Sequence, residues 1–301
     1  MKKEWMGLIQ KREDGSEEVN YDDPSFPSYI YEGWIKPNVT WARVPHFHED
    51  IEMITVKTGK MAYSVNGKNV LLNAGDTIFV NSNQIHYTMA VDDCTATYVI
   101  FVASPEILSA SVAVQMQAIL PVTNSHVLPY LRFRNINEDS EEIYSLMMEL
   151  PAIRRDAFQV TKKFFDIWEI ILRQSKNFGM LNEQLQTDTY TGSFKAMMYF
   201  IQQNYPNPVT LDDISLSGNV SRSLCNRIFH KYVGDSPVNY LLNFRIRKVA
   251  EYLRTTSLSL SEIAAATGFN GTSYMSEMFK KYFGISPREF RKNPVFTINE
   301  K

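Results

Sequence analysis

Two related stretches, FHKYVGDSP at residues 229–237 and FKKYFGISP at residues 279–287, decide how the C-terminal third of this 301-residue chain folds. They agree at six of nine positions and are separated by a constant offset of 50 residues. A short helical pattern precedes each copy, and it starts after Thr210 in one half and after Ser259 in the other, both good N-cap residues. A turn and a second helix then follow. The repeat therefore predicts two helix-turn-helix motifs.

A single helix is expected to join the two motifs. Ser236 and Pro237 suit the N-cap and the first turn of a helix, and an apolar residue recurs every three or four positions from there to Leu253. A continuous helix over 237–255 would be about 28 Å long at about 1.5 Å per residue. Successive major grooves on one face of DNA lie roughly 34 Å apart. A rigid spacer of this length is able to present two reading helices to adjacent major grooves.

The charge distribution favours a polyanionic partner for the C-terminal part only. Residues 190–292 hold 13 Lys/Arg and 7 Asp/Glu, whereas residues 1–189 hold 17 and 25. The two cysteines, Cys94 and Cys225, fit a reducing compartment better than a disulfide framework. The first residues have no apolar core like that of a signal peptide, and Pro105 interrupts the most apolar run. We therefore expect a cytoplasmic protein without a membrane span.

Three segments of the C-terminal part resemble a known family. SFKAMMYFIQQNYPNPVTLDDIS (193–215), SRSLCNRIFHKYVGDSPVNYLLNFRIRKVAEYL (221–253) and SEIAAATGFNGTSYMSEMFKKYFGISPREFRK (261–292) are similar to the DNA-binding domain of AraC-type (AraC/XylS) transcriptional regulators, over roughly residues 192–292. The resemblance implies that the second helix of each motif enters the major groove of double-stranded DNA.

The same resemblance implies which residues contact DNA. It places base contacts on Ser223, Asn226 and Arg227 in the first motif and on Thr272, Ser273 and Glu277 in the second, with phosphate contacts on Arg222, Lys231, Lys280 and Lys281. Arg227 suits a bidentate contact to guanine, and Asn226 suits adenine. Glu277 departs from the family, which often has a basic residue there. It accepts a hydrogen bond from cytosine, or lowers the affinity because it lies near phosphates, or makes no contact.

The N-terminal part reads as a β-structure. Short alternating runs between residues 29 and 102, with an Asn66-Gly67 hairpin signal, predict a small antiparallel barrel or jelly roll. Within it, VPHFHEDIEMITVKTG at residues 44–59 matches the His-x-His-x3-Glu-x6-Gly motif of cupin proteins in full. AGD at residues 74–76, followed by His86, resembles a looser second cupin motif. The barrel is assigned to residues 1–137.

The cupin motifs predict one site, made of His46, His48, Glu52 and His86. Three histidines and a carboxylate suit iron, manganese, nickel or zinc as a divalent transition metal. In AraC-type regulators, however, this barrel usually binds a small-molecule effector, and many members keep histidines without a metal. Three interpretations stay open: a metal ion, direct contact with an effector such as a sugar or related metabolite, or a structural role. Further pocket candidates are Trp41, Arg43, Tyr63 and Tyr87.

The segment between the two parts is expected to be helical over 138–175. Apolar stripes run along Ile143, Leu146, Met147 and Leu150 and along Phe164, Phe165, Trp168, Ile171 and Leu172. Both could pack on the barrel, but helices at this position commonly pair two subunits in this family, so residues 138–175 are assigned to a helical dimerisation segment and at least one stripe is expected to pair two subunits. Residues 176–191 are assigned to a linker that has room for a short helical stretch, 192–292 to the DNA-binding domain and 293–301 to a tail.

The sequence thus predicts an α+β chain, with an N-terminal cupin-like barrel, helices, and an all-α C-terminal domain with two helix-turn-helix motifs. The function implied is a homodimeric, effector-binding transcriptional regulator, not an enzyme, that needs no cofactor and has RNA polymerase as a further partner. One alternative is a cupin metalloenzyme tethered to DNA. Another is an architectural DNA binder whose barrel only dimerises.

Overall fold

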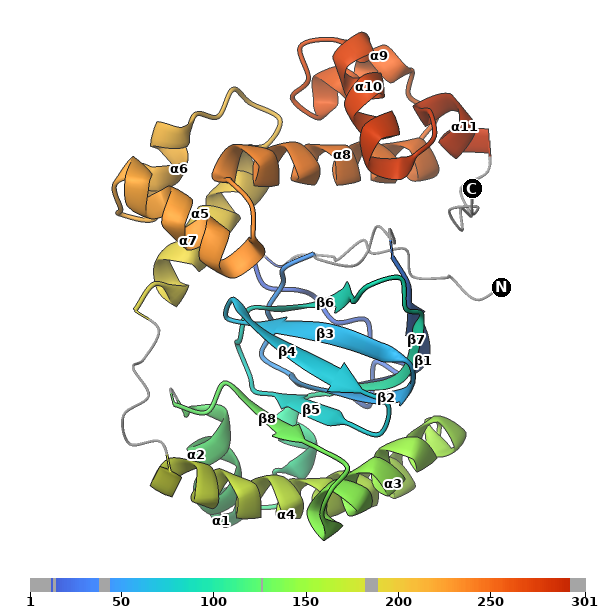
Figure 1. The fold of residues 1–301 in the computed structure, drawn as a ribbon, viewed down its shortest axis with the longest axis vertical. Coiled ribbons are helices and arrows are strands. Elements are labelled where there is room, and N and C mark those ends of the chain that lie inside the picture. Colours follow the sequence, from blue (N-terminus) through green and yellow to red (C-terminus); the bar gives the residue numbers. More distant parts are fainter. Residues whose placement is uncertain (1–11, 13–14, 38–43, 126, 182–188, 293–301) are drawn as a thin grey trace.

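The computed structural model describes residues 12, 15–37, 44–125, 127–181 and 189–292 (Figure 1). In this part of the chain, two antiparallel β-sheets are followed by two long helices and then by a helical C-terminal region. The predicted α+β architecture is confirmed. Among the described helices, none is both long and apolar enough to cross a membrane.

Two sheets form the N-terminal barrel. Their strands are β1 (Ser28–Ile35), β2 (Ile51–Thr58), β3 (Lys60–Val65), β4 (Lys68–Asn73), β5 (Thr77–Val80), β6 (His86–Ala90), β7 (Ala96–Ala103) and β8 (Tyr130–Phe133). One sheet has the order β1-β7-β2-β5-β8 and the other β4-β3-β6. The predicted hairpin joins β3 and β4, where Asn66 and Gly67 have φ of 49° and 80°. Two positive φ values in succession are what a type I′ turn requires.

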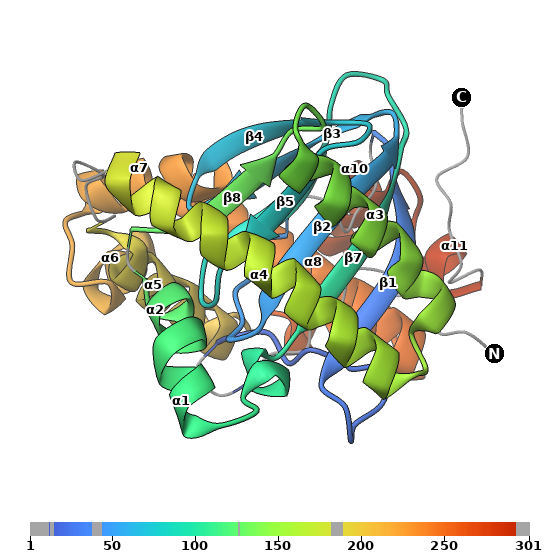
Figure 2. The same ribbon diagram turned by 90° about the horizontal axis from the view of Figure 1, so that it is seen from below.

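The two faces of β2 serve two different cores. Ile51 and Met53 point to the outer face of the five-stranded sheet, whereas Ile54 and Val56 point between the sheets. Helices α3 (Glu138–Ile153) and α4 (Ala157–Leu181) lie across that outer face (Figure 2). Most of both predicted stripes packs against the sheet there, with Phe164 completely buried. Phe165, also predicted in a stripe, is instead 37% exposed.

Helix α4 continues to Leu181, so the segment assigned to a linker from residue 176 begins as the short helical stretch for which the prediction left room. Short helical turns precede β8 where no helix was expected: η1 (Pro105–Leu108), α1 (Val112–Val114), η2 (Gln115–Ile119) and α2 (Leu120–Thr123). Ser104 and Ser111 cap two of these turns. They pack on α4, whose Trp168 donates to the Ala118 carbonyl at 3.1 Å.

The C-terminal region consists of two helix-turn-helix units on one long helix. Its elements are α5 (Thr191–Asn204), α6 (Leu211–Ser217), α7 (Arg222–Val233), α8 (Pro237–Thr255), α9 (Leu260–Ala266), α10 (Thr272–Phe283) and α11 (Pro287–Lys292). Thr210 and Ser259 form capping boxes at α6 and α9, so both predicted caps are confirmed. The predicted helix over 237–255 is confirmed as α8, which Figure 1 shows as an unbroken bar.

Helix α8 belongs to both C-terminal cores. Its first half contributes Tyr240 and Leu241 to the core of the first unit, and its second half contributes Val249 and Leu253 to the core of the second. Because each end of the same helix is buried in a different unit, the spacing between the two units is set by the rise of the helix.

Candidate functional site

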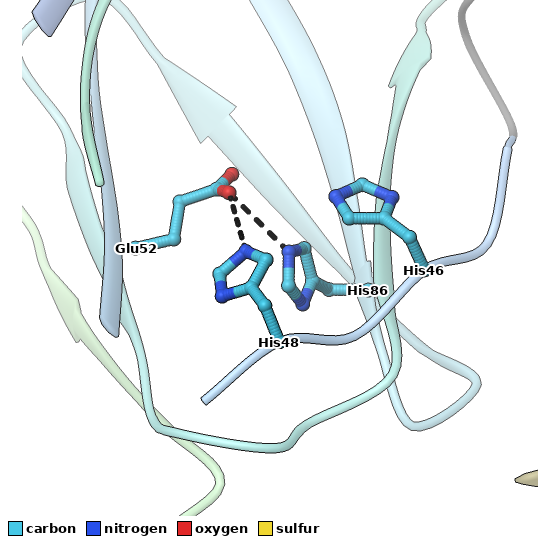
Figure 3. Close-up of side chains that lie close together, drawn as sticks. All are labelled: His46, His48, Glu52 and His86. Atoms are coloured by element: carbon cyan, nitrogen blue, oxygen red, sulfur yellow. Dashed lines mark hydrogen bonds and ion pairs between the residues drawn. The ribbon is translucent and has the colours of Figure 1, made fainter. Parts of the chain in front are cut away.

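The four predicted ligands meet inside the barrel. Glu52 lies on β2, His86 begins β6, and His46 and His48 lie on the segment that leads into β2 (Figure 3). One ligand atom from each residue lies within 4.8 Å of the corresponding atoms of the other three. His46 and His86 are joined through their backbones by two hydrogen bonds, of 3.1 and 2.9 Å. The cupin motifs thus correspond to one side-chain cluster.

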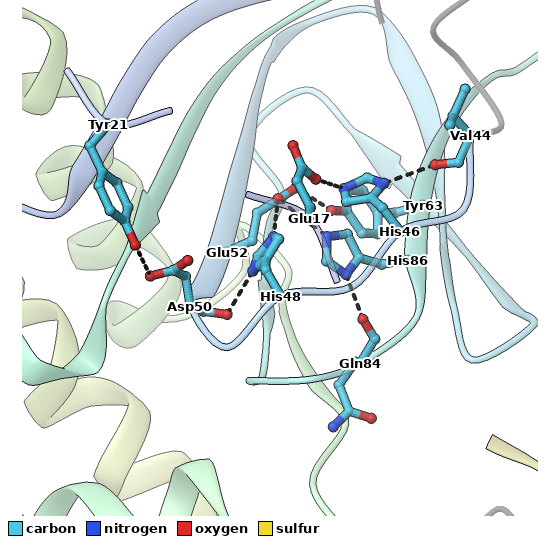
Figure 4. A network of polar contacts seen from close by, with 10 residues as sticks. All are labelled: Glu17, Tyr21, Val44, His46, His48, Asp50, Glu52, Tyr63, Gln84 and His86. Atoms are coloured by element: carbon cyan, nitrogen blue, oxygen red, sulfur yellow. Dashed lines mark hydrogen bonds and ion pairs between the residues drawn. The ribbon is translucent and has the colours of Figure 1, made fainter. Parts of the chain in front are cut away.

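Each histidine ring is oriented by a backbone carbonyl. The Nδ1 of His46 donates to Val44 at 2.8 Å, that of His48 to Asp50 at 3.0 Å, and that of His86 to Gln84 at 2.8 Å (Figure 4). Because a carbonyl only accepts, each Nδ1 carries a proton and each Nε2 is left to face the centre of the cluster. A carbonyl behind the ring is the usual support for a histidine that binds a metal through its other nitrogen.

The centre of the cluster is rich in acceptor atoms. The Glu52 Oε2 atom lies 3.4 Å from the His48 Nε2 and 3.3 Å from the His86 Nε2. The His86 Nε2 is buried without a hydrogen bond of acceptable geometry. Neutral imidazoles would direct lone pairs at the carboxylate, and this repulsion is relieved only by a proton or another cation. The donor set of three imidazole nitrogens and one carboxylate therefore fits a divalent transition metal ion.

The pKa values follow the same electrostatics. Burial, reinforced by the charge of His86, holds the pKa of His46 well below its ordinary value. Burial alone would raise the pKa of Glu52, but the charge of His86 and the hydrogen bond from His48 hold it well below the usual range. Burial would lower the pKa of His48, yet the hydrogen bond and charge of Glu52 outweigh burial and raise it. Glu52 is therefore the anion of the site.

The other predicted pocket residues fall in different places. The Tyr63 hydroxyl donates a hydrogen bond to the Oε1 atom of Glu52, and burial beside that carboxylate raises the pKa of Tyr63 well above its usual value. Tyr87 follows His86 on β6, so its side chain lies on the opposite face of the strand. Trp41 and Arg43 lie outside the described residues.

Two carboxylates near the site were not predicted. The Glu17 Oε2 atom lies 3.4 Å from the His46 Nε2, and the Glu17 N–H donates to the Phe47 carbonyl at 2.7 Å. Asp50 accepts a hydrogen bond of 2.9 Å from the Tyr21 hydroxyl (Figure 4). Glu17 belongs to no periodic pattern or motif, and Asp50 lies inside the cupin motif but at a position that the motif leaves open, so nothing in the sequence was a reason to select either.

The residues expected to contact DNA lie on α7 and α10, and most are exposed. Ser223, Arg227, Ser273 and Glu277 are exposed, as are Lys231, Lys280 and Lys281, whereas Asn226 and Thr272 are half-buried. Some of them have intramolecular partners. Arg222 forms an ion pair with both carboxylate oxygens of Asp212, and the Asn226 side chain donates to the Arg222 carbonyl at 3.0 Å. Asp212 therefore competes with any phosphate for Arg222.

Replacing Tyr63 by Phe should destabilise the barrel. The substitution leaves the buried Glu52 carboxylate without one donor, and a hydrogen bond to a charged group contributes about 1.5–3 kcal/mol. Tyr98→Phe is the matched control, since Tyr98 is a buried barrel tyrosine for which no hydrogen bond to Glu52 is observed. Urea unfolding measures both variants. Equal free energies of unfolding for the two would contradict the assignment.

Comparisons with known proteins agree with both halves of the structure. A family model described as a helix-turn-helix domain matches residues 217–293, and one described as a cupin domain matches residues 36–102. The HTH-type transcriptional regulator YdeC of Bacillus subtilis (strain 168) is 24% identical over 277 residues, which cover 88% of this chain and 92% of that protein. The lactose operon transcription activator of Staphylococcus xylosus is 23% identical over 266 residues, covering 88% and 90%.

Solved structures that are similar to the C-terminal region include one of a bacterial regulator. It is a transcriptional regulator from Chromobacterium violaceum, of the AraC-type DNA-binding domain-containing proteins. It is 30% identical and covers 34% of this chain and 95% of its own, with a TM-score of 0.33. The cupin domain precedes the paired helix-turn-helix units along the chain. Because it combines these two domains, the chain belongs to the AraC-type DNA-binding transcriptional regulators.

Proposed function

We propose that this regulator is a one-component sensor that acts in the cytoplasm. A ligand binds in the barrel at His46, His48, Glu52 and His86, and the reading helices α7 and α10 contact adjacent major grooves. The convergence of three imidazole Nε2 atoms on one buried carboxylate carries this proposal, because it makes a site that requires a positive charge. The domain boundaries predicted from the sequence are retained, except that helix α4 extends into the linker.

The ligand that we propose is a divalent transition metal, alone or together with a small polyhydroxylated effector. Hydroxyl oxygens of a sugar would complete the coordination of an ion held by four protein ligands, or would hydrogen-bond to the same groups in its absence. The likeness to a lactose operon activator supports a sugar as the effector class. The alternative of a metalloenzyme tethered to DNA requires turnover of a bound substrate.

We propose that the regulator dimerises through helix α4. Phe158 is 75% exposed and Phe165 is 37% exposed on its outer side. Phe165 also lines a groove together with Leu108, Ala118 and Leu172. Two antiparallel copies of α4 that meet at Phe165 would set the exposed Lys162 of each copy opposite the exposed Glu169 of the other. Such a pairing is both apolar and charge-complementary.

Metal binding is tested by titrating the purified, chelator-treated chain with Zn²⁺ or Mn²⁺. We expect one ion per chain. Glu52→Gln should lower the affinity for the ion by more than about 100-fold, because replacing a residue that only hydrogen-bonds to a metal ligand already lowers metal affinity by about 10–100-fold. His230→Ala is the control, because this exposed histidine lies on α7. Equal affinity of the Glu52→Gln variant and the native chain would refute the metal site.

DNA reading is tested on a duplex selected from a random library. Arg227→Ala should cost about 1–3 kcal/mol of binding free energy and relax preference at one base position, because a bidentate base contact is lost. Lys280→Ala should weaken binding to all sequences alike and reduce the slope of log K against log salt by about 1. If the two variants behave identically on matched and mismatched duplexes, the assignment of α7 as a reading helix is wrong.

The dimer is tested by light scattering. Phe165→Glu should convert a dimer into a monomer, because it places a carboxylate at the centre of the paired helices near Asp166 and Glu169. Ile136→Glu, at an equally apolar position that is 76% exposed in the turn before α3, should leave the mass unchanged. A Phe165→Glu variant that remains dimeric would exclude α4 as the interface.

A further inference from the structure

The barrel and the first helix-turn-helix unit share an apolar core. Phe47 and Ile85 of the barrel, 5% and 1% exposed, belong to the same buried cluster as Phe194 and Met198 of α5 and Ile228 of α7. Figure 1 shows α5 and α7 beside the barrel. The Lys195 ammonium on α5 lies 4.0 Å from the centroid of the Phe47 ring and donates to the Asn83 carbonyl at 2.8 Å. We call this the interdomain contact.

The interdomain contact uses the same two segments as the ligand site. Phe47 lies between His46 and His48 in the sequence, and Ile85 immediately precedes His86. The backbones of His46 and His86 are hydrogen-bonded to each other, and the Asn83 N–H donates to the His48 carbonyl at 2.7 Å. Residues 46–48 and 83–86 therefore form one hydrogen-bonded unit, with imidazole rings on one side and apolar side chains on the other.

The hairpin between β3 and β4 extends this unit to the end of α7. The Asn66 N–H donates to the Ile85 carbonyl at 2.8 Å, and the Ile85 N–H donates to the Asn66 Oδ1 at 3.0 Å. At the neighbouring Gly67, a Cβ atom would lie 2.2 Å from the carbonyl oxygen of Lys231. The tip of the hairpin is thus in close contact with the backbone of the last turn of the first reading helix.

We propose that the interdomain contact transmits the state of the ligand site to α7, so that binding at the site changes the affinity of the first helix-turn-helix for DNA. This proposal rests on the proposed function and assigns its regulation to Phe47, Ile85 and Gly67. Four donors about 2.1 Å from one ion lie about 3.4 Å from one another. The Glu52 Oε2 atom already lies 3.4 and 3.3 Å from the Nε2 atoms of His48 and His86, whereas the four ligand atoms as a set are only within 4.8 Å of one another. An ion that binds all four would shorten the wider distances, and Phe47 and Ile85 are close-packed neighbours of the ligands in the sequence.

The test perturbs the ligand site in two ways in the full chain, by Zn²⁺ addition and by Glu52→Gln, and follows α5 and α7 by hydrogen exchange. Each perturbation should change the exchange rates of α7 by about 5-fold or more, the lower end of ordinary coupling between sites. Zn²⁺ should change the affinity for the selected duplex by a similar factor. In Gly67→Asn, Zn²⁺ should change neither the exchange rates of α7 nor the affinity for DNA appreciably. Asparagine tolerates the positive φ of this position, but its Cβ atom would collide with the Lys231 carbonyl and separate the hairpin from α7.

Gly284→Asn is the matched control. Gly284 has a φ of 78°, close to the 80° of Gly67, but no atom lies within 4 Å of its Cβ position. This variant should keep the response of α7. Lys195→Met serves as a second disconnecting variant if Gly67→Asn does not fold, because it removes the contacts to Phe47 and Asn83 from the α5 side.

The outcomes separate this proposal from the metal site. If Zn²⁺ does not bind, the metal site fails, but Glu52→Gln still tests the contact through exchange in α7. An α7 that does not respond to Glu52→Gln overturns the proposal, as does a response of equal size in the native chain and in the disconnecting variants. A response lost in Gly67→Asn or Lys195→Met and kept in Gly284→Asn supports it.

Discussion

The two backbone hydrogen bonds between His46 and His86 hold the arrangement on which the rest of the molecule depends. They join the segment that leads into β2, a strand of one sheet, to the first residue of β6, a strand of the other. Side chains alternate along extended backbone. One pairing therefore aims the histidine rings at Glu52 and, on its other side, places Phe47 and Ile85 in the core of the first DNA-binding unit.

A buried carboxylate explains why such a pocket is suited to sensing. An unpaired charge in a low-dielectric interior is costly, so Glu52 is stable only with compensating donors around it. Tyr63 supplies one fixed donor, and the His48 ring, whose pKa is raised by the hydrogen bond and charge of Glu52, supplies another. The ring nitrogens that face Glu52 are also the atoms that an ion would bind in the proposed function.

The sequence predicted well the two repeated helix-turn-helix units and the site that the cupin motifs define. The caps at Thr210 and Ser259 and the continuous helix α8 follow from local sequence rules. The spacing of the cupin motifs identified His46, His48, Glu52 and His86, which the structure places in one cluster. The sequence did not separate Tyr63 from Tyr87: the register between β3 and β6 places Tyr63 on the face of His86, whereas Tyr87, next to His86 on β6, lies on the other face. The contacts of Glu17 and of Phe47 with α5 depend on tertiary packing between distant segments, for which a single sequence carries no periodic signal.

The unbroken course of α8 also limits how this regulator can diverge. Each residue added to or removed from the helix would turn the second unit by about 100° and shift it by about 1.5 Å relative to the first. Small length changes would therefore point the two reading helices at different sides of the duplex. If α7 and α10 contact adjacent major grooves as proposed, the spacing of the two half-sites follows from the length of α8, and the side chains on α7 and α10 choose the bases.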